Sequence, residues 1–436
     1  MGARGEGGVR GGLPLGLWDP GRLGAGELRF EEALAGACGA GAGGGLGLAQ
    51  LRKLSARRAE ALGSPAAAGA GGASGEGGGL GSGGGGEGAA AERVAAAGRY
   101  MALLSGLAAQ AGRLPALKGH KNRLGQVREA VSWSSPLLDG PQSKRQYGLA
   151  GLPQEWGMAC MLYAARMRER GLEGLSALDG EGGETCGDAP AGQEALAEAA
   201  SWLRRASGAY RFCEAEPLPK IRMHLPGERP AEAMPSMADS MATLCLAEAQ
   251  CLVATRALQR GSAGQLVAAL YVGASELFEA ARSTLKKNVG DFNKLSERLM
   301  RYLAVSAAIA TGRALSALAL ERKAEEKLGE AVGLAHLALS KVKQTKAVCE
   351  ICPEWRSECS LEVHALQNLC NRLEQENRIV HFQKVSPATD RALPASKILV
   401  TPIDFVMPKE EKQAFFSGLR RGTDARVLQN PIISSK

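Results

Sequence analysis

Apolar residues recur at helical spacing through most of the sequence between residues 92 and 380, and clusters of glycine and proline divide this pattern into separate runs. A period near 3.6 residues places such side chains on one face of an α-helix, whereas a half-buried strand requires strict alternation. Each run is long enough for several helical turns. We therefore expect helices at 92–111, 153–173, 193–216, 237–260, 264–287, 291–323, 324–346 and 354–380.

The composition supports an all-α fold class. Aromatic residues make up only 4% of the 436 residues, so the aromatic content that strands prefer is scarce. Successive helices of similar length, with alanine and glycine at their contacts, favour antiparallel hairpins stacked as in tetratricopeptide arrays. No repeat of fixed period accompanies them. We expect an elongated, solenoid-like helical body with minor extended segments.

Three breaks interrupt the helical pattern. Residues 63–90 form a glycine- and alanine-rich run that predicts a disordered insertion, and no strand precedes it to support a nucleotide-binding glycine loop. A loop is expected at about 179–192. Prolines between 217 and 235 exclude a continuous helix, and Ser236 is the predicted N-cap of the next one.

The C-terminal part changes character after residue 380. Pro387, Pro394, Pro402 and Pro408 exclude helix, so residues 398–400 are expected to run extended along the helical body. Residues 1–27 and 409–436 are predicted to be flexible, and the second of these segments is basic.

The two central helices each carry two apolar stripes. In 237–260, one stripe starts at Met237 and the other contains Leu246, Ala249 and Val253. The following helix repeats the feature, with Leu266 and Leu270 on its second stripe. A second stripe must be covered by another layer or left at the surface.

The charge and cysteine content limit the function classes. The formal net charge is +8, but acidic and basic residues are intermixed, which predicts solvated faces and at most weak contact with an acidic membrane surface. Exposed aromatic platforms for nucleic acid are not evident. The 10 scattered cysteines predict reduced thiols in a cytoplasmic protein, and no signal peptide or membrane span is expected.

The best candidate for metal chemistry is the cysteine and histidine cluster of the region 349–370. Thiolate and imidazole are zinc ligands, but Cys359 and Cys370 are separated by about three helical turns, or roughly 16 Å, which is too far for one ion. A zinc-binding module or metal-dependent enzyme using this cluster stays as the alternative function. We expect no catalytic residues and no cofactor. The cluster comprises Cys349, Cys352, Cys359, His364 and Cys370.

Several segments resemble those of Bro domains. They are Ala206-Ser207-Gly208-Ala209-Tyr210, Leu246-Ala247-Glu248-Ala249-Gln250 and the stretch from Glu155 to Tyr163, together with an end running from Glu376 through His381 into Lys397–Val400. The resemblance covers residues 28–408 and is similar in extent to the short plant and algal Brox-like members. It implies a boomerang-shaped, mostly helical body with a tetratricopeptide-like core.

The resemblance also implies a function. Bro domains are non-catalytic scaffolds that bind the C-terminal amphipathic helix of an ESCRT-III subunit in an apolar groove, and they act in endosomal sorting and membrane remodelling. In this chain the groove positions fall at Val253, Leu266 and Leu270. Two polar groove contacts of the family map to Gln193 and Ala197, where the charged pair is absent. The resemblance implies a cytoplasmic protein, peripheral at endosomal membranes.

Overall fold

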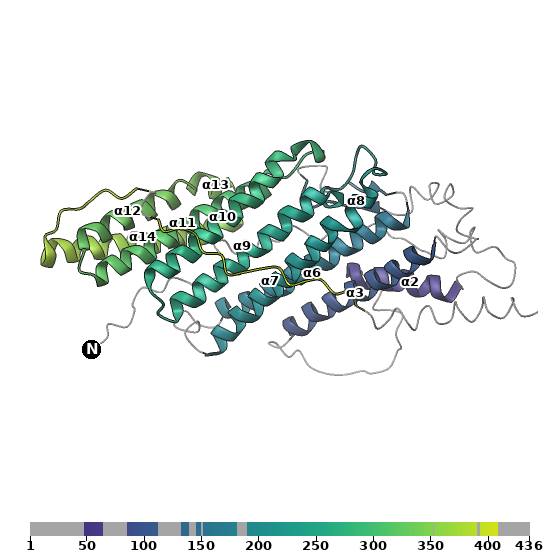
Figure 1. Cartoon of the computed structure of the whole chain (residues 1–436), viewed down its shortest axis with the longest axis horizontal. Helices are drawn as coiled ribbons and strands as arrows, with labels where there is room; N and C mark the ends of the chain where they lie inside the picture. The colour runs from purple at the N-terminus through teal and green to yellow at the C-terminus, as the bar shows by residue number, and fades with distance from the viewer. Residues whose placement is uncertain are drawn as a thin grey trace, which may run out of the picture.

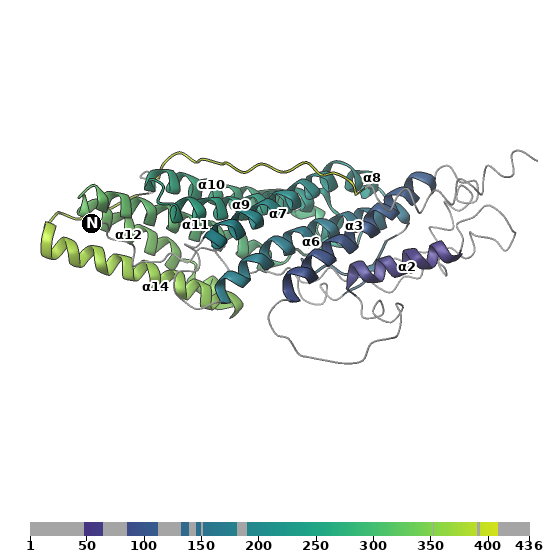
Figure 2. The same cartoon turned by 90° about the horizontal axis from the view of Figure 1, so that it is seen from below.

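The chain folds into an elongated body built almost entirely of helices. A computed structural model describes residues 48–63, 85–111, 132–138, 145–149, 151–180, 190–351, 353–389 and 393–408. In these residues the long helices lie side by side along the long axis (Figure 1), and a view turned by 90° shows the same row of helices edge-on (Figure 2). The predicted all-α class is confirmed.

The long helices follow one another in chain order. They are α2 (Leu48–Leu62), α3 (Gly85–Ala111), α6 (Leu152–Gly180), α7 (Pro190–Ala215), α9 (Pro235–Gln259), α10 (Gly264–Lys287), α11 (Glu297–Ala324), α12 (Leu328–Lys343) and α14 (Pro353–Glu376). Each packs against the next along this series, and α12 packs directly on α14. Short loops join α9 to α10 and α11 to α12 and produce the antiparallel hairpins that were expected there, because they leave no length for a crossover.

Shorter elements fill the connections. They are the strands β1 (Ser132–Trp133) and β2 (Tyr147–Gly148), the helices α8 (Pro217–Arg222) and α13 (Lys346–Ile351), the 3-10 turns η4 (Ala231–Ala233) and η5 (Val289–Asp291), and the π-helical turn η6 (Asn377–His381). The two strands form an antiparallel pair in which Trp133 lies opposite Tyr147. This pair was not predicted, since two-residue strands carry no readable periodicity.

The N-terminal boundaries differ from those expected. The helix α2 was missed, although Leu54 and Ala61, seven residues apart, both point into the core. The helix α3 begins at Gly85, inside the predicted insertion, because the alanines that follow have high helix propensity and Ala90 is buried. The rest of that insertion, the centre of the loop at 179–192, and the segments 1–27 and 409–436 lie outside the described residues.

The predicted N-cap at Ser236 is wrong. The helix α9 starts two residues earlier than predicted, at Pro235, with Met234 as N-cap. Proline fits there because its fixed φ suits a helix and its missing N–H would have no partner in any case. Ser236 lies inside the helix, and its hydroxyl donates to Asp291 Oδ2 at 2.9 Å.

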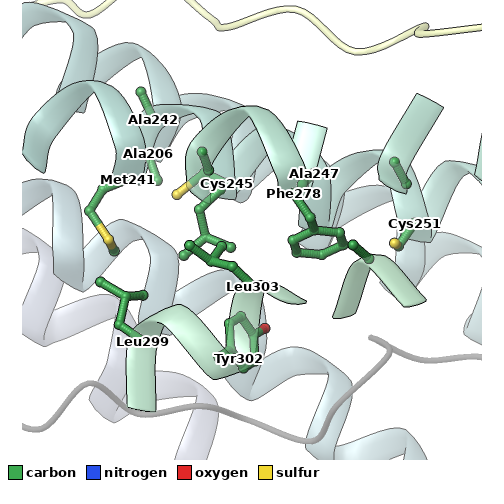
Figure 3. Packing of buried hydrophobic residues seen from close by; sticks show 14 of the residues in the cluster. Ala206, Met241, Ala242, Cys245, Ala247, Cys251, Phe278, Leu299, Tyr302 and Leu303 are labelled. Carbon is green, nitrogen blue, oxygen red and sulfur yellow. The ribbon is translucent and has the colours of Figure 1, made fainter. Parts of the chain in front are cut away.

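The centre of the core lies between α9, α10 and α11. Figure 3 shows Met241, Leu299 and Leu303 gathered near the thiol of Cys245, with Phe278 farther along the same cluster. By length and composition α9 and α11 could each cross a membrane, yet most of each apolar window is buried within the body. Central helices of a packed protein have this composition because they are covered on several sides.

Two buried ion pairs connect helices through the core. Arg168 of α6 donates to both carboxylate oxygens of Glu248 of α9, and Tyr302 of α11 donates to the same carboxylate at 2.9 Å. Nearer the N-terminus, Arg58 of α2 donates to Glu155 of α6 at 2.7 Å. Charges withdrawn from water are stable only when they are paired, so each ion pair fixes the relative position of its helices.

Candidate functional site

The three residues predicted to line a groove lie on the neighbouring helices α9 and α10. Val253 is on α9, and Leu266 and Leu270 are on α10. The side chain of Gln250 donates to the carbonyl oxygen of Leu270 at 3.1 Å, which sets the register of the two antiparallel helices. Val253, one turn beyond Gln250, therefore lies level with Leu266, one turn before Leu270.

The three side chains differ in exposure. Val253 and Leu266 are half-buried and keep part of their surface open. Leu270 is only 1% exposed and belongs to the core, so it does not line an open groove as the resemblance implied. Its direction differs because four residues along a helix add about 40° of rotation, enough to turn a side chain from the edge of the stripe to its buried side.

The helix α7 borders the same surface. Gln193 donates to Gln259 Oε1 at 2.7 Å and accepts from Arg256 Nε at 3.3 Å, so α7 is tied to the C-terminal end of α9. Ala197, one turn along, is half-buried on α7, which packs against α9. The two positions at which the resemblance implied a charged pair thus carry an amide and a methyl group, and the nearby cation is Arg256.

An extended C-terminal arm, residues 393–408, borders the surface on its other side. Figures 1 and 2 show it as the yellow trace running across the face made by α10, α9 and α7. Lys397 N donates to Ala269 O at 3.0 Å, and Gln250 both donates to Lys397 O at 2.8 Å and accepts from Leu399 N at 3.1 Å. The predicted extended path along the helical body is confirmed.

The arm covers part of the second apolar stripe. Val400 is buried against Leu246, Ala249 and Leu252, and Val253 packs at the edge of this cluster. One stripe of α9 therefore faces the main core, and most of the other packs against α6 and α7, with Val400 of the arm closing the cluster. Only the end of the stripe near Val253 and Leu266 stays partly open, while Ile398 and Leu399 of the arm are themselves exposed.

Glycines allow the arm to lie close to the helices. A Cβ atom at Gly273 of α10 would lie 2.7 Å from Lys397 O, and one at Gly208 of α7 would lie 1.7 Å from Ile403 O. Both distances are shorter than the closest approach of a Cβ atom to another heavy atom in real proteins. The arm could therefore not occupy this path if either position carried a residue other than glycine. These helical glycines were a sequence signal for a close crossing.

We call the partly open surface formed by Ala197, Val253, Leu266, Ile398 and Leu399 the α9–α10 surface. Its apolar side chains come from three packed helices and from the arm, and hydrogen bonds hold each of these in place. The arm residues were not predicted as part of the site, since the spacing of residues within helices cannot show which side chains a later extended segment will add. Chemically the surface can bury apolar side chains of a partner.

The predicted metal cluster does not come together in the part of the chain that the structure describes. No group of three or more histidine, cysteine, aspartate or glutamate side chains there is arranged to hold a metal ion. Cys359 is in a disulfide bond, which also corrects the expectation of reduced thiols at that position. His364 is exposed, whereas Cys370 is buried. The side chains of Cys349 and Cys352 lie outside the described residues.

Buried titratable groups occur elsewhere in the core. Burial raises the pKa of Glu232, on η4, to about 7, and burial raises the pKa of Cys251 to about 12. Neither residue borders an open surface, since both are buried. Their shifts follow from the loss of water around the charged form, and the packing of the core is sufficient to explain them.

Comparisons with known proteins show a match to one family model and a similar fold in solved structures. The sequence profile described as BRO1-like domain matches residues 186–420. No curated protein matches. Among solved structures, "ALIX BRO1 CHMP4C complex" has a TM-score of 0.59 at 16% identity and covers 90% of this chain and 96% of that chain. At this identity the structural similarity shows that the two chains share a fold.

Two further structures are similar. A crystal structure of ALIX with the SIVmac239 PYKEVTEDL late domain has a TM-score of 0.62 at 16% identity, covering 91% of this chain and 50% of that one. The structure described as the basis for endosomal targeting by the Bro1 domain has a TM-score of 0.57 at 12% identity, covering 94% and 100%. The present chain thus spans all of one such domain and half of a longer protein.

Proposed function

Because this chain belongs to the BRO1-like domain family, we propose that it is a non-enzymatic adaptor that binds the C-terminal amphipathic helix of an ESCRT-III subunit. The docking site in this proposal is the α9–α10 surface. A similar fold has been solved as a complex with CHMP4C, an ESCRT-III subunit. That complex supports the class of partner, and the identity of the subunit for this chain is left to experiment.

The partial exposure of Val253 and Leu266 is the observation that carries the proposal. In this proposal the two aliphatic side chains, at the same level on adjacent helices, serve as an apolar strip together with the exposed Ile398 and Leu399 of the arm. An amphipathic helix buries residues at i, i+3, i+4 and i+7, and such a strip is the complementary surface. Leu270 would act beneath it, as packing that holds Leu266 in position.

The direct test is the affinity for a fluorescent ESCRT-III C-terminal peptide, measured by anisotropy with the whole chain. Leu266→Asp should weaken binding about tenfold or more, since removing a central apolar anchor from such an interface costs that much. Val253→Asp should act in the same direction. Leu361→Asp, at an exposed leucine on α14 away from the surface, is the matched control and should bind like the wild type.

The choice of Leu266 keeps the test separate from folding. Leu270→Asp would place a charge in the core and lower stability whatever the function, whereas Leu266 and Val253 are half-buried. Circular dichroism and thermal unfolding of each variant give the necessary check. Equal affinity of wild type and Leu266→Asp, with both folded, would show that the peptide does not bind at the α9–α10 surface.

Recruitment to endosomal membranes follows as the cellular part of the proposal. One of the similar structures is described as the basis for endosomal targeting by the Bro1 domain, and the same route would place this chain at sites where ESCRT-III assembles. A fluorescent fusion of the full chain should colocalise with ESCRT-III on endosomes. The Leu266→Asp fusion should become diffuse, while the Leu361→Asp fusion should keep the wild-type distribution.

A further inference from the structure

The turn that follows α14 carries a cluster of apolar side chains at one end of the molecule. Ile379, Val380 and Phe382 are 59%, 63% and 76% exposed. Figures 1 and 2 both place the end of α14 at the extreme left of the long axis, where the chain reverses toward the arm. We call residues 377–385 the apical turn. Exposed apolar clusters of this kind on a polar protein mark an interaction site.

The apical turn has little need of an aromatic side chain for its own stability. Phe382 has φ of 53°, in the left-handed region that bulky residues rarely adopt. Asparagine or glycine would meet this backbone conformation at lower cost. The phenylalanine is also largely in water. Neither the turn nor the core explains its presence, which favours a role outside the molecule.

The backbone of the apical turn is already hydrogen-bonded within the protein. Phe382 N donates to Asn377 O at 2.6 Å, Gln383 N donates to Asn377 Oδ1 at 3.0 Å, and Asn377 Nδ2 donates to Gln383 O at 2.8 Å. Gln383 also bridges to α12 by accepting from Gly329 N at 3.0 Å. A turn braced in this way can enter an apolar layer without leaving these polar groups unpaired.

The charges around the turn favour an anionic surface. Arg378 and Lys384 flank the apolar side chains, and neither has an ion-pair partner among the described residues. The neighbouring lysines do form ion pairs: Lys323 is paired with Glu376, and Lys327 is paired with Glu325. Glu326, whose backbone oxygen accepts from Gln383 in the turn, carries one negative charge. Arg378 and Lys384 carry two positive charges, so the net charge of these three residues is positive.

From these observations we propose that the apical turn inserts Ile379, Val380 and Phe382 into the interfacial layer of an anionic lipid membrane. A convex end with a rigid backbone, apolar tips and flanking cations fits a bilayer surface. A partner helix would instead require a concave strip. The turn and the α9–α10 surface lie on different elements, so the chain could contact a membrane and its protein partner together. The inference goes beyond the proposed function.

Vesicle flotation with the full chain tests the proposal, with vesicles of phosphatidylcholine and phosphatidylserine compared with phosphatidylcholine alone. The wild type should float with the anionic vesicles. Phe382→Asn should weaken this binding about tenfold, the loss expected for one buried aromatic side chain, and its thermal stability should stay equal or rise. Val289→Asn, at an apolar residue that is 66% exposed on η5, is the matched control and should float normally.

Three results would overturn the inference. The first is a wild type that stays unbound to both kinds of vesicle. The second is equal flotation of wild type and Phe382→Asn with loss of binding only when Arg420, Arg421 and Arg426 are changed to Gln, which would assign the contact to the basic C-terminal segment. The third is a dimer in sedimentation that Phe382→Asn converts to a monomer without any vesicle binding, which would make the turn a protein interface. None of these three measurements uses the ESCRT-III peptide, so a failure of the membrane proposal can be distinguished from a failure of the proposed function.

Discussion

The backbone N–H of Leu399 donates to the side chain of Gln250 at 3.1 Å and joins the C-terminal arm to the central helix α9. The side-chain amide of Gln250 in turn donates to Lys397 O and to Leu270 O. One buried side chain therefore connects α9, α10 and the arm. A residue of α9 becomes a structural partner of a segment 149 positions later in the sequence.

Replacing this amide should release the arm. In Gln250→Leu, Lys397 O and Leu399 N lose their partner, at an expected cost of about 1–3 kcal/mol in the free energy of unfolding. Hydrogen exchange should become faster at residues 397–401 than elsewhere. The control is Gln193→Leu, which removes a half-buried amide away from the arm. Unchanged exchange in Gln250→Leu would show that other contacts hold the arm.

The arm should also be sensitive to the glycine beneath it. In Gly208→Ala the new methyl group would lie 1.7 Å from Ile403 O, so the arm must move away and we expect a loss of about 1–3 kcal/mol from overpacking. Limited proteolysis should cut the arm sooner in this variant. Gly290→Ala adds a methyl group where nothing lies within 4 Å and should be cut like the wild type.

The buried ion pair should be costly to break. Glu248 and Arg168 are almost fully enclosed, so Glu248→Leu removes the carboxylate that balances a buried cation and should cost about 3–5 kcal/mol. The exposed pair of Arg301 and Glu297 gives the control, since Glu297→Leu should change stability by about 1 kcal/mol or less. Urea unfolding measures both. Similar losses in the two variants would contradict the proposed importance of burial.

Glu232 should make stability depend on pH. Its pKa is raised by burial from 4.5 to about 7, so the folded protein keeps a proton that the unfolded chain releases. The unfolded state is therefore favoured as pH rises from 4.5 to 7, with a total loss of about 3 kcal/mol. Glu232→Gln should abolish this part of the profile, which thermal unfolding between these two pH values would detect. If the stability of the wild type and of Glu232→Gln falls in parallel over this pH range, Glu232 is not the source of the pH dependence.

The helices that sequence predicted best are those with clear breakers at both ends. The run 264–287 matches α10 residue for residue, because Gly261 precedes it and Asn288 follows. The run 291–323 was predicted to begin too early, since Asp291 to Leu295 form a turn and a bridge before Ser296 caps α11. Local composition does not distinguish such a turn from a first helical turn.

The site was predicted only in part. Sequence periodicity could identify the second stripe with Val253 and Leu266, because it depends on spacing within one helix. It could not show that Leu270 turns into the core or that Val400 covers Leu246. Both outcomes depend on contacts between segments far apart in the chain. Gly208 and Gly273 mark where a close crossing is possible, but they do not show which segment crosses there.

The path of the arm also sets an order for assembly of the molecule during synthesis. Phe405 packs against Tyr163 and Phe212, so the first hairpins emerge from the ribosome with an aromatic face bare. Each later hairpin can stack on its predecessor at once, but this face waits until nearly the whole domain has been translated. Nascent chains therefore expose Tyr163 and Phe212 to solvent until Phe405 has been synthesised and can cover them.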